Sequence, residues 1–205
     1  MYKIEQGSEE INSNGGMVFI GKLLNGLESL KKIDAMNMGT IQKGRTSHSG
    51  ILKSAATLMA LGRNDYADIE CFREDPLFTD VLKLKAVPSE ETLRQRLDDI
   101  STANESQTML DDAIVELLSR VDDFGAEKTE YSSYVPLDID VAVQDNSGSH
   151  KEGVSWTYKN VDGYAPIFSY LGTEGYMLAN ELRNGSQHSA KGAVEFGERT
   201  VDMAL

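Results

Sequence analysis

One short segment limits what this chain can fold into more than any other: the alternating stretch between Val135 and Val143. Apolar residues alternate with other side chains along it, which is the period of a β-strand with one buried face. Asp138 and Asp140 therefore share a face of that strand, and Asp145 follows at a polar turn. Charges on a half-buried strand are costly unless they are paired. Because hard cations take oxygen ligands, the pattern indicates a divalent-metal site, with a solvated acidic face as the alternative.

Helical periods precede this strand and further alternating segments follow it. Apolar spacing predicts helices over Met17–Lys32, 49–62, Asp65–Arg73, Leu77–Leu84, Ser89–Ile100 and Asn104–Val121, and strands over Val135–Val143, Ala165–Gly172 and Tyr176–Arg183. Helices followed by strands predict an α+β fold, with the boundary between Gly125 and Tyr134. The long connection from Gln144 to Tyr164 is expected to be a functional or mobile loop. Within it, Asp145, His150 and Glu152 are a weaker candidate metal site, with solvated side chains as the commoner alternative.

The segments after the acidic strand carry more specific motifs. Tyr164–Gly172 reads YAPIFSYLG, Gly175–Arg183 reads GYMLANELR, and Glu181–His188 reads ELRNGSQH. Together with GGMVFIGKLL, GRTSHSGIL and the FREDPLF segment upstream, this order resembles the DDE transposases of bacterial insertion sequences, in the branch called DDE group one. The resemblance covers nearly the whole chain.

The resemblance implies a helical, DNA-binding region over residues 1–130, followed by a partial ribonuclease H-like catalytic domain over 131–205. The partial domain would consist of the first three antiparallel strands and the start of the next helix. Family members are about twice as long, and the second Asp and the Glu of their catalytic triad are absent from this chain. We therefore expect an amino-terminal fragment that is inactive by itself, so its status as an enzyme is uncertain.

The resemblance also implies site residues and a cofactor. Asp140 is the expected first catalytic carboxylate and a metal ligand, with Asp138 as the neighbouring candidate. Related enzymes carry Asp-x-Thr there, whereas this chain has Ala142 at the Thr position, and the register between the two acids stays open. The implied cofactor is Mg²⁺, which this fragment would bind weakly or not at all.

We consider two functions of different classes. The first is transposition: binding of insertion-element ends and metal-dependent phosphodiester cleavage with strand transfer. The second is a non-catalytic DNA-binding or regulatory fragment, with a decayed gene remnant as a further alternative. The expected partners are DNA and either a second copy or an intact transposase.

The distribution of charge favours the amino-terminal part as the DNA contact. The net charge is −13, yet residues 17–63 hold seven basic residues against two acidic ones, a balance of +5. Residues 98–145 hold thirteen acidic residues against two basic ones, a balance of −11. The candidate DNA-binding residues are Lys31, Lys32, Lys43, Arg45, Lys53, Arg94 and Arg96. The last two lie on the Ser89–Ile100 helix, where they are expected to point away from the core stripe of Leu93, Leu97 and Ile100.

The cysteine content and the absence of long apolar runs indicate the cellular compartment. The single cysteine, Cys71, excludes an internal disulfide, fits a reducing cytoplasm and is expected to be buried. No signal peptide or membrane-spanning run is recognisable in the sequence, so we expect a cytoplasmic, nucleoid-associated bacterial protein.

Overall fold

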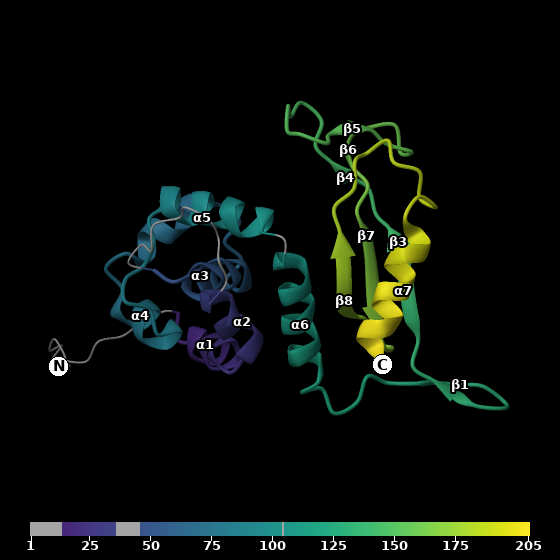
Figure 1. Ribbon diagram of the computed structural model, residues 1–205, viewed down its shortest axis with the longest axis horizontal. Coiled ribbons are helices and arrows are strands. Elements are labelled where there is room, and N and C mark those ends of the chain that lie inside the picture. Colours follow the sequence, from purple (N-terminus) through teal and green to yellow (C-terminus); the bar gives the residue numbers. More distant parts are fainter. Residues whose placement is uncertain (1–13, 36–45, 104) are drawn as a thin grey trace, which may run out of the picture. The chain divides into compact units, whose positions relative to one another are not determined.

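The computed structural model describes residues 14–35, 46–103 and 105–205, and it has the α+β composition expected from the sequence (Figure 1). The contacts divide the chain into two compact units, Met1–Met109 and Leu110–Leu205. The first unit is helical, and the second holds all the strands among the described residues. The predicted functional boundary near residue 130 stays a prediction. The packing divides the chain about twenty residues earlier, after Met109. Just beyond that division, the carboxylate of Asp111 lies 3.6 Å from Nε of Arg199 in the carboxyl-terminal helix.

The first unit is a set of short helices with clear local start signals. They are α1 (Met17–Asn25), α2 (Glu28–Lys32), η1 (Ile33–Ala35), α3 (His48–Ala60), η2 (Tyr66–Phe72), α4 (Pro76–Leu82) and α5 (Glu90–Thr102). The side chains of Ser47, Asp75 and Ser89 accept hydrogen bonds from the first turns of α3, α4 and α5. Such caps satisfy backbone N–H groups that have no partner within the helix.

The first predicted helix is broken in the structure. The pattern predicted one helix over Met17–Lys32, but Leu27 adopts an extended conformation between α1 and α2. Its side chain is only 1 % exposed. The chain thus leaves the helical conformation at Leu27, where the leucine side chain enters the core.

Cys71 lies on the surface, so the expectation that it is buried is wrong. The segment around it, η2, is a 3₁₀-helix with three residues per turn rather than an α-helix. Ile69 and Phe72, three positions apart, therefore turn inward together. Phe72 packs against Phe78 of α4 with ring centroids 4.7 Å apart, which leaves Cys71 facing outward.

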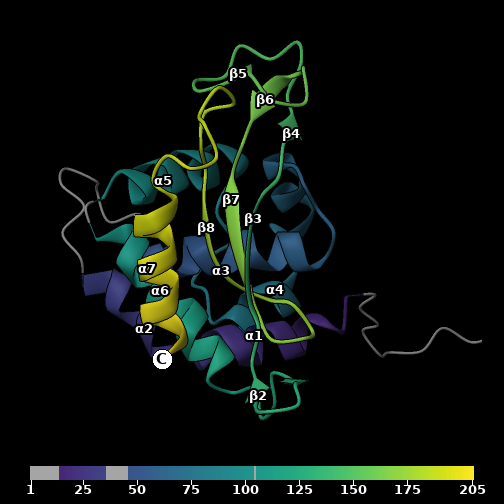
Figure 2. The same ribbon diagram turned by 90° about the vertical axis from the view of Figure 1, so that its right-hand side faces the viewer.

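The second unit is built on a three-stranded antiparallel sheet, in the order β3 (Leu137–Val141), β7 (Ile167–Leu171) and β8 (Tyr176–Glu181). These strands agree with the three predicted ones to within about two residues at each end, the usual uncertainty of such assignments. The helix α7 (Ala193–Ala204) lies on one face of the sheet (Figures 1 and 2). Phe196 of α7 packs there against Ile167 and Ala179 in a small buried core.

The predicted long connection between β3 and β7 is not a structureless loop. It contains β4 (Gln144–Asp145), β5 (Ser155–Trp156) and β6 (Asp162–Tyr164), which form a small sheet in the order β4-β6-β5. The N–H of Ala142 donates to the carbonyl of Pro166 at 3.1 Å, between the two sheets. The pairs β3–β7 and β4–β6 are therefore successive parts of one long hairpin, as Figure 2 shows.

Two smaller elements complete the second unit. The helix α6 (Ser106–Leu118) begins in the first unit and continues into the second. It precedes a two-stranded hairpin of β1 (Glu127–Lys128) and β2 (Ser133–Tyr134). None of the helices among the described residues is long and apolar enough to cross a membrane.

Candidate functional site

The two carboxylates of β3 share an exposed face of the main sheet. Asp138 lies opposite Tyr170 of β7, and Asp140 lies opposite Phe168. Residues directly opposite one another in an antiparallel pair point to the same side. This face therefore presents two acids beside two aromatic rings, whose centroids are 6.3 Å apart. Both acids are exposed, whereas Val141 packs against the core under α7.

The strand that carries the acids lies at the edge of its sheet. β3 pairs with β7 along one side, and no strand pairs with its other side within the described part of the chain. The carboxylates of Asp138 and Asp140 are therefore exposed to water. Because they are not buried, they need no cation to compensate for lost hydration.

The two carboxylates on one face of β3 match, in number, what commonly holds one Mg²⁺ ion. Such an ion is normally held by one or two carboxylates, with water and substrate phosphate as the other ligands. Asp138 and Asp140, two positions apart on one face, provide that number of carboxylates. No group of three or more His, Cys, Asp and Glu side chains that could hold a metal occurs among the residues with described positions.

The second candidate metal site, in the connection after β3, is therefore wrong: Asp145, His150 and Glu152 do not form such a group. Instead, the carboxylate of Asp145 accepts a hydrogen bond from the N–H of Ser147 at 2.8 Å. Hydrogen bonds from Ser147 lower the pKa of this carboxyl below its ordinary value. Asp145 thus stabilises a local turn.

An open pocket of about 780 Å³ lies beside Asp140. Its walls come from β3, from the segment at β5, from the loop after β8 and from the start of α7; they include Asp140, Trp156, Tyr158, Ser186, Gln187 and His188. The lining also includes Ile139, Val141 and Ile167, on the face of the sheet that α7 covers, so the pocket meets β3 mainly from the side opposite the face that Asp138 and Asp140 share. Sequence reasoning missed Trp156 and Tyr158, although a lone tryptophan in a polar connection is a signal of an exposed functional aromatic residue.

One buried arginine organises the loop that forms the far wall of this pocket. Arg183 is 3 % exposed, and its Nε donates to the carboxylate of Glu181 at 2.9 Å. Its two terminal nitrogens donate to the carbonyls of Ser189 at 3.4 Å and Gly192 at 3.2 Å. The guanidinium also lies 5.8 Å from the ring centre of Phe196. Arg183 therefore ties β8, the loop and α7 together.

The basic residues predicted to contact DNA lie on neighbouring helices of the first unit. Lys31 and Lys32 end α2, and Lys53 lies on α3; Lys43 and Arg45 fall outside the described residues. Lys31 forms an ion pair with Glu28, and the ammonium of Lys53 donates to the Asn25 side chain at 2.8 Å.

The structure adds one lysine to this group. Burial is the main cause that lowers the pKa of Lys53, and repulsion by Lys83 and Lys31 adds to it, against the attraction of Asp34. Lys83 is therefore close enough to Lys53 to act on its charge, although nothing in the sequence spacing indicated it. We call Lys31, Lys53 and Lys83 the basic group.

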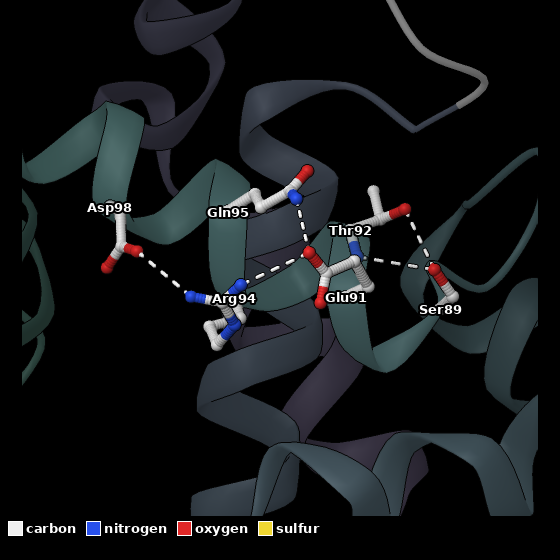
Figure 3. A network of polar contacts seen from close by, with 6 residues as sticks. All are labelled: Ser89, Glu91, Thr92, Arg94, Gln95 and Asp98. Carbon is white, nitrogen blue, oxygen red and sulfur yellow. Dashed lines mark hydrogen bonds and ion pairs between the residues drawn. The ribbon is translucent and has the colours of Figure 1, made fainter.

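The two arginines predicted on α5 have different surroundings, and Figure 3 shows those of Arg94. Arg94 is exposed and lies between Glu91, at 3.1 Å, and Asp98, at 3.8 Å. Arg96 is only 7 % exposed; it donates to the Thr46 carbonyl at 3.4 Å and to Nδ1 of His48 at 2.9 Å.

The expectation that Arg96 points away from the core stripe is therefore wrong. The buried stripe of α5 consists of Leu93, Arg96 and Ile100, with Leu97 only half-buried. The helix is rotated so that the two terminal nitrogens of Arg96 reach polar partners in and before α3, while its buried Nε has no hydrogen-bond partner. The contact of Arg94 and Arg96 with DNA stays a prediction.

The comparisons with known proteins agree with the resemblance. The family model described as "Transposase DDE domain group 1" matches residues 3–204. Comparison with curated proteins and with solved structures gives no significant match. Since the family model spans nearly the whole chain, including β3 with its two carboxylates, this protein belongs to the group 1 DDE transposases.

Proposed function

We propose that this protein acts in the transposition of an insertion sequence by binding DNA and contributing to metal-dependent cleavage and strand transfer. The observation that carries the proposal is the pair Asp138 and Asp140, exposed on one face of the first strand of an antiparallel sheet. Membership of the transposase family supports the reaction class. Asp140 is the proposed first metal ligand, and Asp138 is the alternative.

The proposed catalytic domain has a ribonuclease H-like arrangement. Three consecutive long strands, β3, β7 and β8, pair antiparallel and are followed by α7 on one face. This order supports the proposal because it leaves the acidic face of β3 uncovered by α7. A phosphodiester can approach that face from solvent.

The carboxylates have a defined role in the proposed chemistry. When bound, Mg²⁺ would stabilise the developing charge on the phosphodiester and lower the pKa of an attacking water. Asp140 would hold the ion against β3, because its backbone is fixed opposite Phe168 by the strand pairing. Asp138, on the same face, would supply a second oxygen ligand or orient a bound water.

DNA binding is proposed to start from the basic group on the first unit. Lys31, Lys53 and Lys83 gather three positive charges in a chain whose net charge is −13. Glu28, which pairs with Lys31, and Asp34, which attracts Lys53, offset part of that charge. Lys32, Lys43, Arg45, Arg94 and Arg96 are the further residues proposed to contribute to DNA binding. Each neutralised phosphate releases counterions, so the affinity should fall steeply with salt.

A non-catalytic DNA-binding function is the second candidate. The basic group belongs to the first unit, while both β3 carboxylates belong to the second. Since different units carry the two sets of residues, DNA binding does not require cleavage.

Cleavage of supercoiled DNA in Mg²⁺ or Mn²⁺ tests the first candidate. Asp140→Asn and Asp138→Asn are compared with Asp202→Asn, which alters an exposed acid on α7. Abolished cleavage in Asp140→Asn alone would support Asp140 as the metal ligand, and loss in Asp138→Asn alone would exchange the two roles. Equal cleavage by all variants would refute the site. Salt-dependent DNA binding without any cleavage by the unmodified protein would favour the non-catalytic function.

A further inference from the structure

The pocket beside Asp140 has the size and lining of a ligand site. Its volume of about 780 Å³ lies within the roughly 300–1,000 Å³ range of small-molecule pockets. It is open to solvent on one side, so a group attached to a longer molecule could enter. Its ligand is therefore best identified from the chemistry of its walls.

Two aromatic side chains stand out in those walls. Trp156 is 59 % exposed and Tyr158 is 60 % exposed, although both are large apolar residues. The hydroxyl of Tyr158 donates to the carbonyl of Val141 at 2.9 Å, directly after Asp140 in β3. This bond fixes the position of the ring beside the acidic strand. Exposed, positioned aromatic rings of this kind are platforms for flat ligands.

The opposite wall offers hydrogen-bonding groups. Ser186, Gln187 and His188 line it, on the loop that Arg183 ties to α7. Each already makes one bond within the protein: the Ser186 hydroxyl accepts from Ser155, the Gln187 amide donates to the Lys191 carbonyl, and His188 Nδ1 accepts from the N–H of Ala190. The Ser186 O–H, the Gln187 amide oxygen and His188 Nε2 are the groups left to face a ligand. A flat heterocycle with polar edges would match aromatic rings on one side and these groups on the other.

The charge of the lining excludes a phosphate as the group inside the pocket. Asp140 is an acid, and no lysine or arginine is among the lining residues. A dianionic phosphate would lie there without a countercharge. The ammonium of Lys159, which is not a lining residue, lies 5.9 Å from the Tyr158 ring centre. The pocket thus suits a neutral base, with the charged backbone outside.

We propose that this pocket holds one unstacked nucleobase of a DNA strand, stacked on Trp156 and Tyr158, while the charged sugar-phosphate backbone stays outside the pocket. The inference rests on the proposed function, because it makes the nucleobase part of the DNA on which this site acts. Extruding a base costs stacking energy, which is smallest in single strands. A single-stranded or frayed end is therefore the preferred ligand.

The intrinsic fluorescence of Trp156 tests this directly, because it is the only tryptophan in the chain. The full chain is titrated with a single-stranded oligonucleotide of about 12 nucleotides, within the usual site size. Ca²⁺ replaces Mg²⁺ so that the strand is not cut. An abasic strand of equal length and the free mononucleotide dAMP are titrated in parallel.

Matched variants separate stacking from general binding. Trp156→Leu and Tyr158→Leu remove the two platforms, and Tyr131→Leu removes a ring that is 88 % exposed in the β1–β2 hairpin. Binding is measured by fluorescence anisotropy of a labelled strand. We expect saturable quenching of Trp156 by the base-bearing strand only, and roughly 5- to 150-fold weaker binding for each pocket variant. Tyr131→Leu should bind like the unmodified protein.

The outcomes separate this inference from the proposed function. Salt-dependent binding of the base-bearing and abasic strands with equal affinity, and no quenching, would overturn the pocket assignment and leave DNA binding intact. Quenching by dAMP at the same concentration as by the strand would overturn the assignment to a DNA strand. If Asp140→Asn shows no effect on cleavage while the quenching persists, the catalytic proposal fails and the base pocket stands. Absence of any DNA binding would overturn both.

Discussion

Arg183 offers the sharpest test of how the pocket is held together. We predict that Arg183→Met, which keeps the length of the side chain but removes its donors, destabilises the second unit and loosens the loop of residues 185–192. Arg183→Lys keeps the charge but loses the planar fork that reaches several acceptors at once. The two variants therefore separate the effect of charge from that of geometry.

The magnitude follows from the four contacts of Arg183. The bonds to the Ser189 and Gly192 carbonyls are long, at 3.4 and 3.2 Å, so each is assigned about 1 kcal/mol. The ion pair with Glu181, whose side chain is 42 % exposed, adds about 0.5 kcal/mol because water screens it. The contact with the Phe196 ring adds about 0.5 kcal/mol. Arg183→Met should therefore reduce the free energy of unfolding by about 3 kcal/mol, and Arg183→Lys by about half as much.

Urea denaturation followed by Trp156 fluorescence measures this change, since Trp156 belongs to the same unit. Arg120→Met is the matched control. Its side chain is 39 % exposed and pairs with Glu116 one helical turn away, so its loss should cost no more than about 0.5 kcal/mol. Hydrogen exchange of residues 185–192 reports the loop itself, and it should accelerate in Arg183→Met.

Two results together would refute this role of Arg183: a loss of stability in Arg183→Met no larger than in Arg120→Met, and unchanged hydrogen exchange in the loop of residues 185–192. A loss of stability without faster exchange would show that Arg183 supports the sheet and α7 rather than the pocket wall.

Three further predictions concern packing and pH. Phe196→Ala, at the centre of the core under α7, should cost about 3–5 kcal/mol in the same urea assay, and a cost below about 1 kcal/mol would contradict that packing. Gly185→Ala should destabilise the pocket region, because its methyl group would overlap the carbonyl oxygen of Ser155. Gly197→Ala, in the middle of α7 with space around it, should instead stabilise the protein by about 0.5–1 kcal/mol. Changes in the free energy of unfolding with the same sign in both variants would count against both assignments. Burial lowers the pKa of Lys53 below its ordinary 10.5, so the unfolded chain holds more protons between the two values and stability should rise with pH across that interval. Circular dichroism melts of Lys53→Met should lose that part of the rise, and an unchanged pH profile would refute the effect.

Local sequence patterns predicted several parts of this protein well. The alternation around Asp138 and Asp140 predicted β3, because side-chain direction in a strand depends only on neighbouring positions. Ser89 predicted the start of α5 for a similar reason, since a cap acts within one helical turn. The motifs over Tyr164–Arg183 were specific enough to indicate the transposase family, which the family match shows.

Other features depended on which elements pack together, and no local pattern contains that information. Arg96 looked like a surface residue until Thr46 and His48, about fifty positions earlier, provided its buried partners. Lys83, which directly follows α4, comes near Lys53 of α3 only in the folded chain.

The site itself divides in the same way. The sequence alone determined that two carboxylates share a face of a strand, because that follows from the two-residue period of β structure. Only the tertiary structure placed Asp140 in one cavity with Trp156 and His188, because the cavity is made by a bent hairpin and a loop that Arg183 holds to α7. Contacts between distant segments depend on burial and on polar partners, and these exist only after the chain has folded.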